Sequence, residues 1–120
     1  MTRFDASIYL PLTPAMFQVL VALADGEKHG YAIIKEVARR TGGKVRLRAG
    51  TLYTVIKRFA ADGLIEESAE RPDPALDDER RRYYRLSERG RAVAVAEAQR
   101  LEETLLQARS KLALRRSSGH

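Results

Sequence analysis

Residues 49–62 read AGTLYTVIKRFAAD, and this stretch decides the fold that we expect for the chain. At about 100° per residue, Leu52, Ile56 and Phe59 fall on one face of a helix, and Gly63 ends it. The opposite face carries small, polar and basic side chains: Thr51, Thr54, Lys57 and Arg58. The pattern therefore predicts a helix with an apolar back held by a core and a polar front open to a partner.

Two further helices are predicted before this one. Thr13 followed by Pro14 is typical of an N-cap and a first helical position, and the helix over 14–24 is apolar nearly all round. Such a helix must be covered on every side, which indicates a second partner such as another subunit. A second helix over 30–41 has an apolar stripe and ends at a glycine pair.

The pattern changes after the third helix. Residues 64–68 and 80–86 are predicted to form two short strands of a hairpin. The loop between them, residues 69–79, is rich in proline and acidic residues and is expected to be exposed.

A long last helix is predicted over residues 88–114, capped by Ser87. Apolar residues recur within it at alternating four- and three-residue steps, at Ala94, Ala98, Leu101, Leu105, Ala108 and Leu112. This heptad seam favours a partner helix, because a helix of about 40 Å is longer than so small a domain can cover. The predicted dimer interface is this seam together with Met16 and Phe17.

The predicted fold is thus mainly α with a small two-stranded β-hairpin: a winged helix-turn-helix followed by a long dimerisation helix. The expected organisation is a DNA-binding domain over 1–86, the dimerisation helix over 87–114 and a flexible tail over 115–120. In such a domain the third helix enters the major groove.

Charge supports a polyanionic partner. The chain of 120 residues has a net charge of +6, and residues 28–58 hold nine basic residues against the single acidic Glu36. A field so concentrated attracts nucleic acid, although a solvated basic face is the plainer alternative for this feature alone. The predicted DNA contacts are Gly50, Thr51, Tyr53, Thr54, Lys57, Arg58 and Tyr31, with Arg80, Arg81 and Arg82 at the base of the wing.

Five ring-bearing residues near the predicted third helix and hairpin have separate interpretations. His29 is expected to cap or pack rather than to bind phosphate at a helix N-terminus. Tyr31 is expected to bury its ring against the third helix and leave its hydroxyl for phosphate, whereas Tyr53 either donates to phosphate or only packs. Tyr83 and Tyr84 alternate on a strand, so one should face the core.

Three stretches in order resemble the PadR family of bacterial transcriptional regulators. They are HGYAI over 29–33, GTLYTVIKRF over 50–59 followed by DGLI over 62–65, and RYYRLSERG over 82–90. The resemblance spans residues 12–106, and the single C-terminal helix is similar to that of the short subgroup.

The resemblance implies a homodimer formed through the first and last helices, with each third helix in one half of a roughly palindromic operator. It further implies repression, and release of DNA by a small hydrophobic or aromatic effector that can sit between subunits near the last helices.

Two features depart from the family pattern. The wing loop is acidic, with Glu70, Asp73, Asp77, Asp78 and Glu79, so the arginines at its base are better candidates for DNA contact than its tip. The chain also has no tryptophan, so an effector pocket built on a tryptophan platform is absent. Two interpretations remain for the other apolar residues: they line an effector pocket, or they only pack in the core. These residues are Tyr9, Met16, Phe17 and the leucines of the last helix.

Other classes of function are disfavoured. The chain has no cysteine, two histidines, no glycine-rich phosphate loop and no nucleophile motif, so neither an enzyme, a metal site nor a cofactor is expected. No apolar stretch approaches a membrane span of about 20 residues, and a cytoplasmic protein is expected. A winged-helix adaptor without DNA and a binder of structured RNA remain as alternatives; the narrow RNA major groove opposes the second.

Overall fold

The computed structural model describes residues 3–68 and 82–113. The element order is a 3-10 turn η1 (Ala6–Tyr9), α1 (Pro14–Ala22), β1 (Lys28–His29), α2 (Gly30–Arg40), α3 (Ala49–Ala61), β2 (Ile65–Glu67), β3 (Tyr83–Leu86) and α4 (Glu88–Leu112). The winged helix-turn-helix with a long last helix is confirmed. The wing loop, Arg80, Arg81 and the predicted tail lie outside the described residues.

The sheet differs from the prediction. It has three antiparallel strands in the order β1-β3-β2, because Lys28 and His29 pair with Tyr84 and Tyr83. The predicted two-stranded hairpin was therefore incomplete. A strand of two residues is too short to show any alternation, so no pattern in the sequence could reveal it.

The helix boundaries follow the predicted caps. Thr13 accepts a hydrogen bond from the Met16 amide at 3.1 Å, with Pro14 at the first helical position. Ser87 Oγ accepts from the Gly90 amide at 3.0 Å. Gly63 follows α3 with φ +76, a left-handed conformation that favours glycine.

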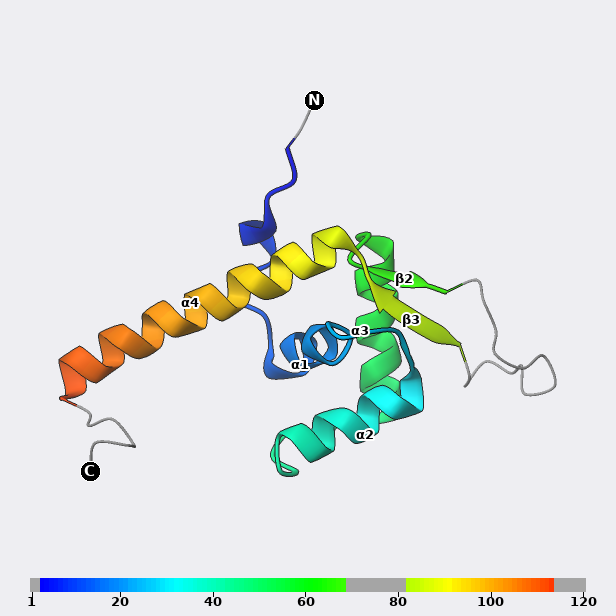
Figure 1. Cartoon of the computed structure of the whole chain (residues 1–120), viewed down its shortest axis with the longest axis horizontal. Coiled ribbons are helices and arrows are strands. Elements are labelled where there is room, and N and C mark those ends of the chain that lie inside the picture. The colour runs from blue at the N-terminus through cyan, green and yellow to red at the C-terminus, as the bar shows by residue number, and fades with distance from the viewer. Residues whose placement is uncertain (1–2, 69–81, 114–120) are drawn as a thin grey trace.

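α1 lies at the centre of the domain, where α2, α3 and α4 all pack against it (Figure 1). Its Val19 and Leu20 are fully buried, together with Leu52 and Phe59 of α3. The first turns of α4 join the same core through Val93. The second half of α4 extends away from the other elements (Figure 1). The helix thus contributes to the core with its first turns only.

No helix within residues 3–68 and 82–113 is long and apolar enough to cross a membrane.

Candidate nucleic-acid interface

α3 separates its two faces as its sequence predicts. Leu52, Val55, Ile56 and Phe59 are buried, so the back of the helix is fixed by the core. The opposite face of α3 also agrees with the prediction, since all of its predicted contact residues are exposed: Gly50, Thr51, Thr54, Lys57 and Arg58. α3 therefore has one polar and basic face that is exposed and one apolar face that the core holds in place, as a helix that reads a DNA groove requires.

Gly50 lies in the first turn of this front without any internal need for a glycine. A Cβ at this position would meet nothing within 4 Å. Glycine in a helix costs about 1 kcal/mol relative to alanine. The absence of a side chain therefore serves only to keep this part of the helix surface thin.

Tyr31 and Tyr53 differ in their packing. Tyr31 is 61% exposed, and its ring stacks beside His29 and lies 5.2 Å from Lys35 Nζ, so the prediction that it is buried against the third helix was wrong. Tyr53 packs from α3 toward the start of α2: its hydroxyl lies so close to Gly30 that a Cβ there would come within 2.4 Å of it. The packing reading of Tyr53 is the one that this contact supports.

His29 is a cap. Its Nδ1 accepts a hydrogen bond from the Ala32 amide at 3.2 Å, and its ring meets the edge of Tyr83 with centroids 5.4 Å apart. The predicted alternation of the strand is confirmed, because Tyr84 is buried in the core while Tyr83 is half-buried.

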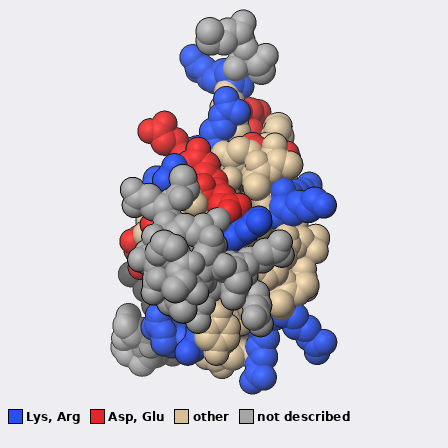
Figure 2. All heavy atoms as spheres, turned by 90° about the vertical axis from the view of Figure 1, so that its right-hand side faces the viewer, with Lys and Arg blue, Asp and Glu red and all other residues tan. Residues whose placement is uncertain are grey.

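The cations near the wing and those on α3 differ in their partners. Arg82 Nη1 lies 3.6 Å from Glu67 Oε1, and Arg85 Nε donates to Glu66 Oε1 at 3.1 Å. Lys57 and Arg58 form no ion pair with the described residues. Figure 2 shows Lys and Arg side chains projecting at several points around the edge of the molecule, with a band of acidic side chains between them and further acidic side chains at the edges.

A small groove lies between α3 and the sheet. It has a volume of about 260 Å³, and its walls include Tyr53 and Lys57 from α3 and Glu67, Arg82 and Tyr84 from the strands. Two cations from different elements thus flank one depression beside the front of α3.

A second, apolar groove follows α4. It has a volume of about 570 Å³ and is lined by Phe17, Val95, Ala98, Gln99, Leu101, Glu102 and Leu105. Leu101, Leu105 and Leu112 of the predicted seam are 41%, 48% and 65% exposed, whereas Met16, Ala94 and Ala108 are half-buried. The leucines of the seam are therefore left exposed in the described part of the chain, whereas Ala94 packs against the core of the domain.

The exposed apolar face of α4 is wider than the heptad seam. It also includes Val95 and Leu106, which are 50% and 60% exposed. Each of the two follows a seam position directly, so a strict search for alternating steps of four and three passes over them. Their exposure is the signal that sequence reasoning lacked.

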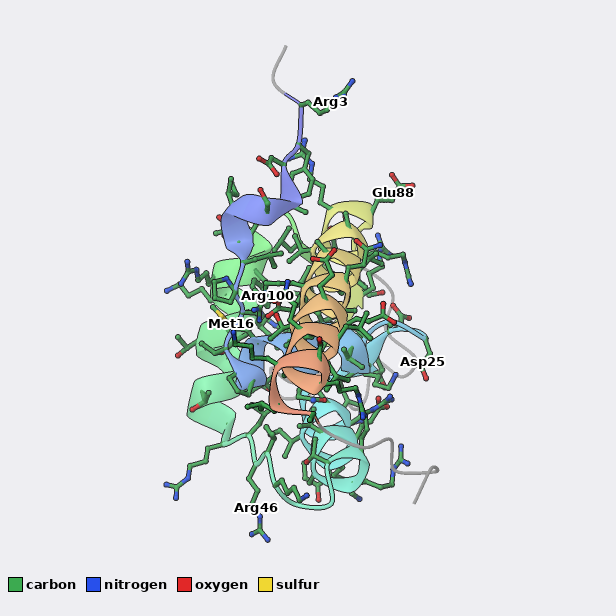
Figure 3. The ribbon with its side chains drawn as sticks, turned by 90° about the vertical axis from the view of Figure 1, so that its left-hand side faces the viewer. Arg3, Met16, Asp25, Arg46, Glu88 and Arg100 are labelled. Atoms are coloured by element: carbon green, nitrogen blue, oxygen red, sulfur yellow. The ribbon has the colours of Figure 1, made fainter. Side chains whose placement is uncertain are left out.

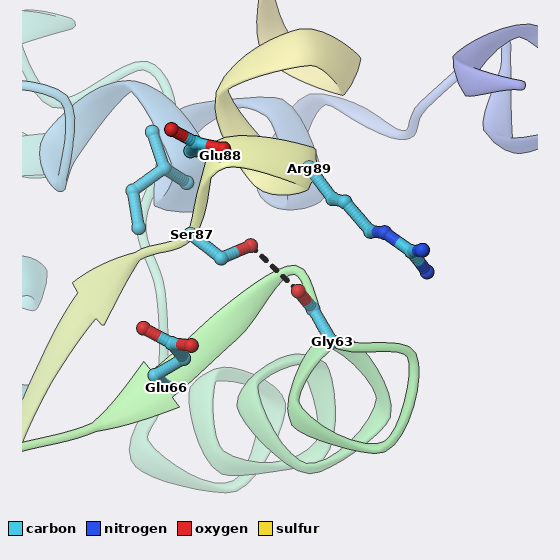
Figure 4. Close-up of a pocket in the computed structure, with 6 residues that line it drawn as sticks. Gly63, Glu66, Ser87, Glu88 and Arg89 are labelled. Atoms are coloured by element: carbon cyan, nitrogen blue, oxygen red, sulfur yellow. Dashed lines mark hydrogen bonds between the residues drawn. The ribbon is translucent and has the colours of Figure 1, made fainter. Parts of the chain in front are cut away.

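The end of α3 is bonded directly to the start of α4 (Figure 4). Ser87 Oγ donates to the Gly63 carbonyl at 2.6 Å, and the Ser87 amide donates to the Leu64 carbonyl at 3.0 Å. A Cβ on Gly90 would lie 2.1 Å from the same Leu64 oxygen, so only glycine allows this approach. We call Gly63, Leu64, Ser87 and Gly90 the α3–α4 junction.

A buried carboxylate ties the N-terminal segment to α4. Glu97 is 1% exposed, and its Oε2 accepts from the Leu12 amide at 2.9 Å. The hydrogen bond from Arg100, and then that from the Leu12 amide, hold the pKa of Glu97 below its usual value. Sequence reasoning missed this residue, since one glutamate among several on a helix carries no distinguishing pattern.

Among residues 3–68 and 82–113, no three His, Asp or Glu side chains come together as a metal site would require.

Comparison with known proteins assigns the family from the sequence. Residues 19–96 match the transcriptional regulator PadR-like family. The chain is 36% identical over 85 residues to transcriptional regulator Rv3488 of Mycobacterium tuberculosis, which covers 71% of this chain and 73% of that protein.

Solved structures share the fold. A transcriptional regulator from Clostridium thermocellum aligns with a TM-score of 0.62 at 23% identity, over 90% of this chain and 94% of the other. A PadR family regulator from Clostridium difficile R20291 aligns with a TM-score of 0.62 at 24% identity, over 80% and 97%. The family match begins within α1, covers α2, α3 and the strands, and ends within α4; the chain belongs to the PadR-like family of transcriptional regulators.

Proposed function

We propose that this protein is a cytoplasmic repressor that binds a roughly palindromic DNA operator as a homodimer. The observation that carries the proposal is the front of α3, where exposed polar and basic side chains stand on a fully buried apolar back. A helix of this kind fits the major groove.

The proposed contacts have different tasks. Thr51 and Thr54 face the base edges, with Gly50 allowing close approach, while Lys57 and Arg58 bind phosphates or guanine edges. The DNA backbone is assigned to Tyr31, which is exposed, and to Arg80, Arg81 and Arg82. Tyr53 contributes from the wall of the groove between α3 and the sheet.

Dimerisation is proposed through the exposed apolar face of α4. Leucines that stay in water along a 25-residue helix favour burial against an equivalent face, since each buried leucine contributes about 1.5–3 kcal/mol. Two-fold symmetry in the protein then requires two-fold symmetry in the operator. The groove that contains Phe17 and Leu101 offers an apolar place for a small hydrophobic or aromatic effector at this interface.

The test is a gel-shift titration against the DNA upstream of the protein's own gene, at two salt concentrations and with unrelated DNA as competitor. Specific retardation that weakens steeply with salt is expected, because several phosphates are contacted. Equal binding to both DNAs, or none, would favour a winged-helix adaptor for a protein partner. Hydrophobic compounds can then be screened for release of the retarded complex.

A further inference from the structure

The cations of the DNA-binding domain fall into two groups by their partners. Lys28 and Arg40 share Glu36, and the strand arginines Arg82 and Arg85 lie beside carboxylates. A second group is exposed and has no ion pair with any residue that the structure describes; besides Arg3 and Lys35, it consists of Arg39, Lys44, Arg46, Arg48, Lys57 and Arg58. A cation already beside a carboxylate gains less from a phosphate, so the second group is the better source of DNA affinity.

Three of the unpaired cations alternate with apolar residues between α2 and α3. Lys44, Arg46 and Arg48 are exposed, whereas Val45 is half-buried and Leu47 is buried in the core. Exposure with a period of two is typical of an extended segment; residues 46–48 belong to neither a helix nor a turn, whereas Lys44 and Val45 lie in a bend. In an extended segment, residues two apart lie about 7 Å from each other, which is similar to the spacing of successive phosphates on one DNA strand.

The segment is anchored to the domain. Thr41 Oγ1 donates to the Val37 carbonyl at 2.8 Å and accepts from the Val45 amide at 3.1 Å. The Gly43 amide donates to the Ala38 carbonyl at 2.8 Å. Together with the burial of Leu47, these bonds fix the backbone that presents the three cations, so little ordering entropy remains to oppose binding.

The segment leads directly into α3. Arg48 is the N-cap residue of α3, and no side chain caps that end of the helix. The first-turn amides there favour an anion, next to the open surface at Gly50. Figure 3 shows Arg46 at the edge of the molecule, pointing away from the domain, at the opposite end from Arg3.

We propose that residues 44–48 form a second phosphate-binding element, in which Lys44, Arg46 and Arg48 bind consecutive phosphates of the strand that passes the N-terminus of α3. The inference rests on the proposed function and adds to it a source of sequence-independent affinity outside α3. Arg82 and Arg85, which lie beside carboxylates, contribute less.

The test compares two double variants with equal loss of charge. In Lys44→Gln with Arg46→Gln, two cations of the element are removed but no buried group changes. In Arg3→Gln with Lys111→Gln, two exposed cations outside the element are removed. Fluorescence anisotropy then gives the dissociation constant for an upstream duplex and for unrelated DNA over a range of salt concentrations.

We expect the first variant to lose roughly 10- to 100-fold in affinity at 0.1 M salt, and its log–log salt slope to fall in magnitude by about two. Both DNAs should be affected alike, because phosphates carry no sequence, and the exchange Lys44→Arg with Arg46→Lys should keep the slope. The Arg3 and Lys111 variant should behave as the wild type, and melting curves should show that all variants fold.

Three outcomes would overturn the inference. An unchanged slope in the Lys44 and Arg46 variant, with wild-type protein that binds DNA, removes the element and leaves the proposed function intact. Loss on the upstream duplex alone would assign these residues to base reading instead. A wild-type protein that binds no DNA removes both proposals.

Discussion

α3 and α4 are both amphipathic helices, but they leave opposite kinds of surface exposed. α3 buries its large aliphatic residues and Phe59 and exposes threonines and cations. α4 buries only its first turns and exposes leucines along the rest of its length. One helix therefore offers a partner charge and hydrogen bonds, while the other offers it apolar area.

This difference indicates two separate partners with different chemistry. A polar front on a fixed back suits a polyanion that already has its own hydration and counterions. An exposed apolar face suits an interface whose energy comes from burial. DNA binding through α3 and dimerisation through α4 should therefore be lost independently of each other in suitable variants.

The largest effect is expected from Leu101→Glu with Leu105→Glu. Four buried leucines would be replaced in the proposed dimer, and even a loss of about 4 kcal/mol raises the dimer dissociation constant roughly 1000-fold. Analytical ultracentrifugation should find a folded monomer. Gln107→Glu with Lys111→Gln, which makes the same change of charge on the opposite side of α4, should stay dimeric; a dimer in both variants would show that the apolar face of α4 is not the interface.

The second-largest effect is expected from Gly90→Ala, which should lower the stability of the fold. The new Cβ would meet the Leu64 carbonyl and the Leu86 side chain, and overpacking of this kind lowers the free energy of unfolding by about 3 kcal/mol, or roughly 10–20 °C in Tm. The matched variant is Gly50→Ala, where space is open: its Tm should rise slightly while its DNA affinity falls. Calorimetry and anisotropy separate the two, and a Gly50→Ala protein with full DNA affinity would contradict close approach at this point.

A smaller effect on DNA, and none on the fold, is expected from Lys57→Ala and from Arg58→Ala. Each should weaken binding by about 5- to 10-fold and reduce the salt slope by about one, because neither side chain touches the core. Lys111→Ala serves as the control for lost charge. Unchanged affinity in both α3 variants would overturn the assignment of the groove-facing side.

The smallest effect is expected from Glu97→Gln. The variant should lose about 1 kcal/mol of unfolding free energy at pH 7, since the amide cannot replace a charged acceptor fully. The folded-state pKa of Glu97 is lowered, so its stabilisation is present above the unfolded pKa of about 4.3 and is lost as the pH falls through the folded value. Urea unfolding should therefore show the two proteins converging below pH 4; a constant difference would assign the effect to packing. Glu103→Gln, on the exposed part of α4, should change stability by less than about 0.5 kcal/mol.

The sequence was most informative where a helix has one buried face. Leu52, Ile56 and Phe59 predicted the orientation of α3 because a period of 3.6 leaves little choice, and Thr13, Pro14, Ser87 and Gly63 predicted helix boundaries because capping is local. The dimer seam of α4 was predicted by the same periodicity and remains a prediction.

The sequence was least informative where a contact joins distant residues. The pairing of β1 with β3, the exposure of Tyr31 and the bond between Glu97 and Leu12 depend on which segments meet in space. The unpaired state of Lys44, Arg46 and Arg48 depends likewise on where each carboxylate lies, which a count of charges does not reveal.

The α3–α4 junction has a consequence for the length of the operator. In the proposed dimer, α4 sets the position of each subunit, and the Gly63, Leu64, Ser87 and Gly90 contacts fix α3 relative to α4 without an intervening linker. Inserting one base pair between half-sites turns one of them by roughly 34–36° around the DNA axis, and no slack at the junction can follow that turn. The proposed dimer therefore has a fixed distance between its two α3 helices. Its binding should tolerate base substitutions in the centre of the operator far better than a change in the number of base pairs there.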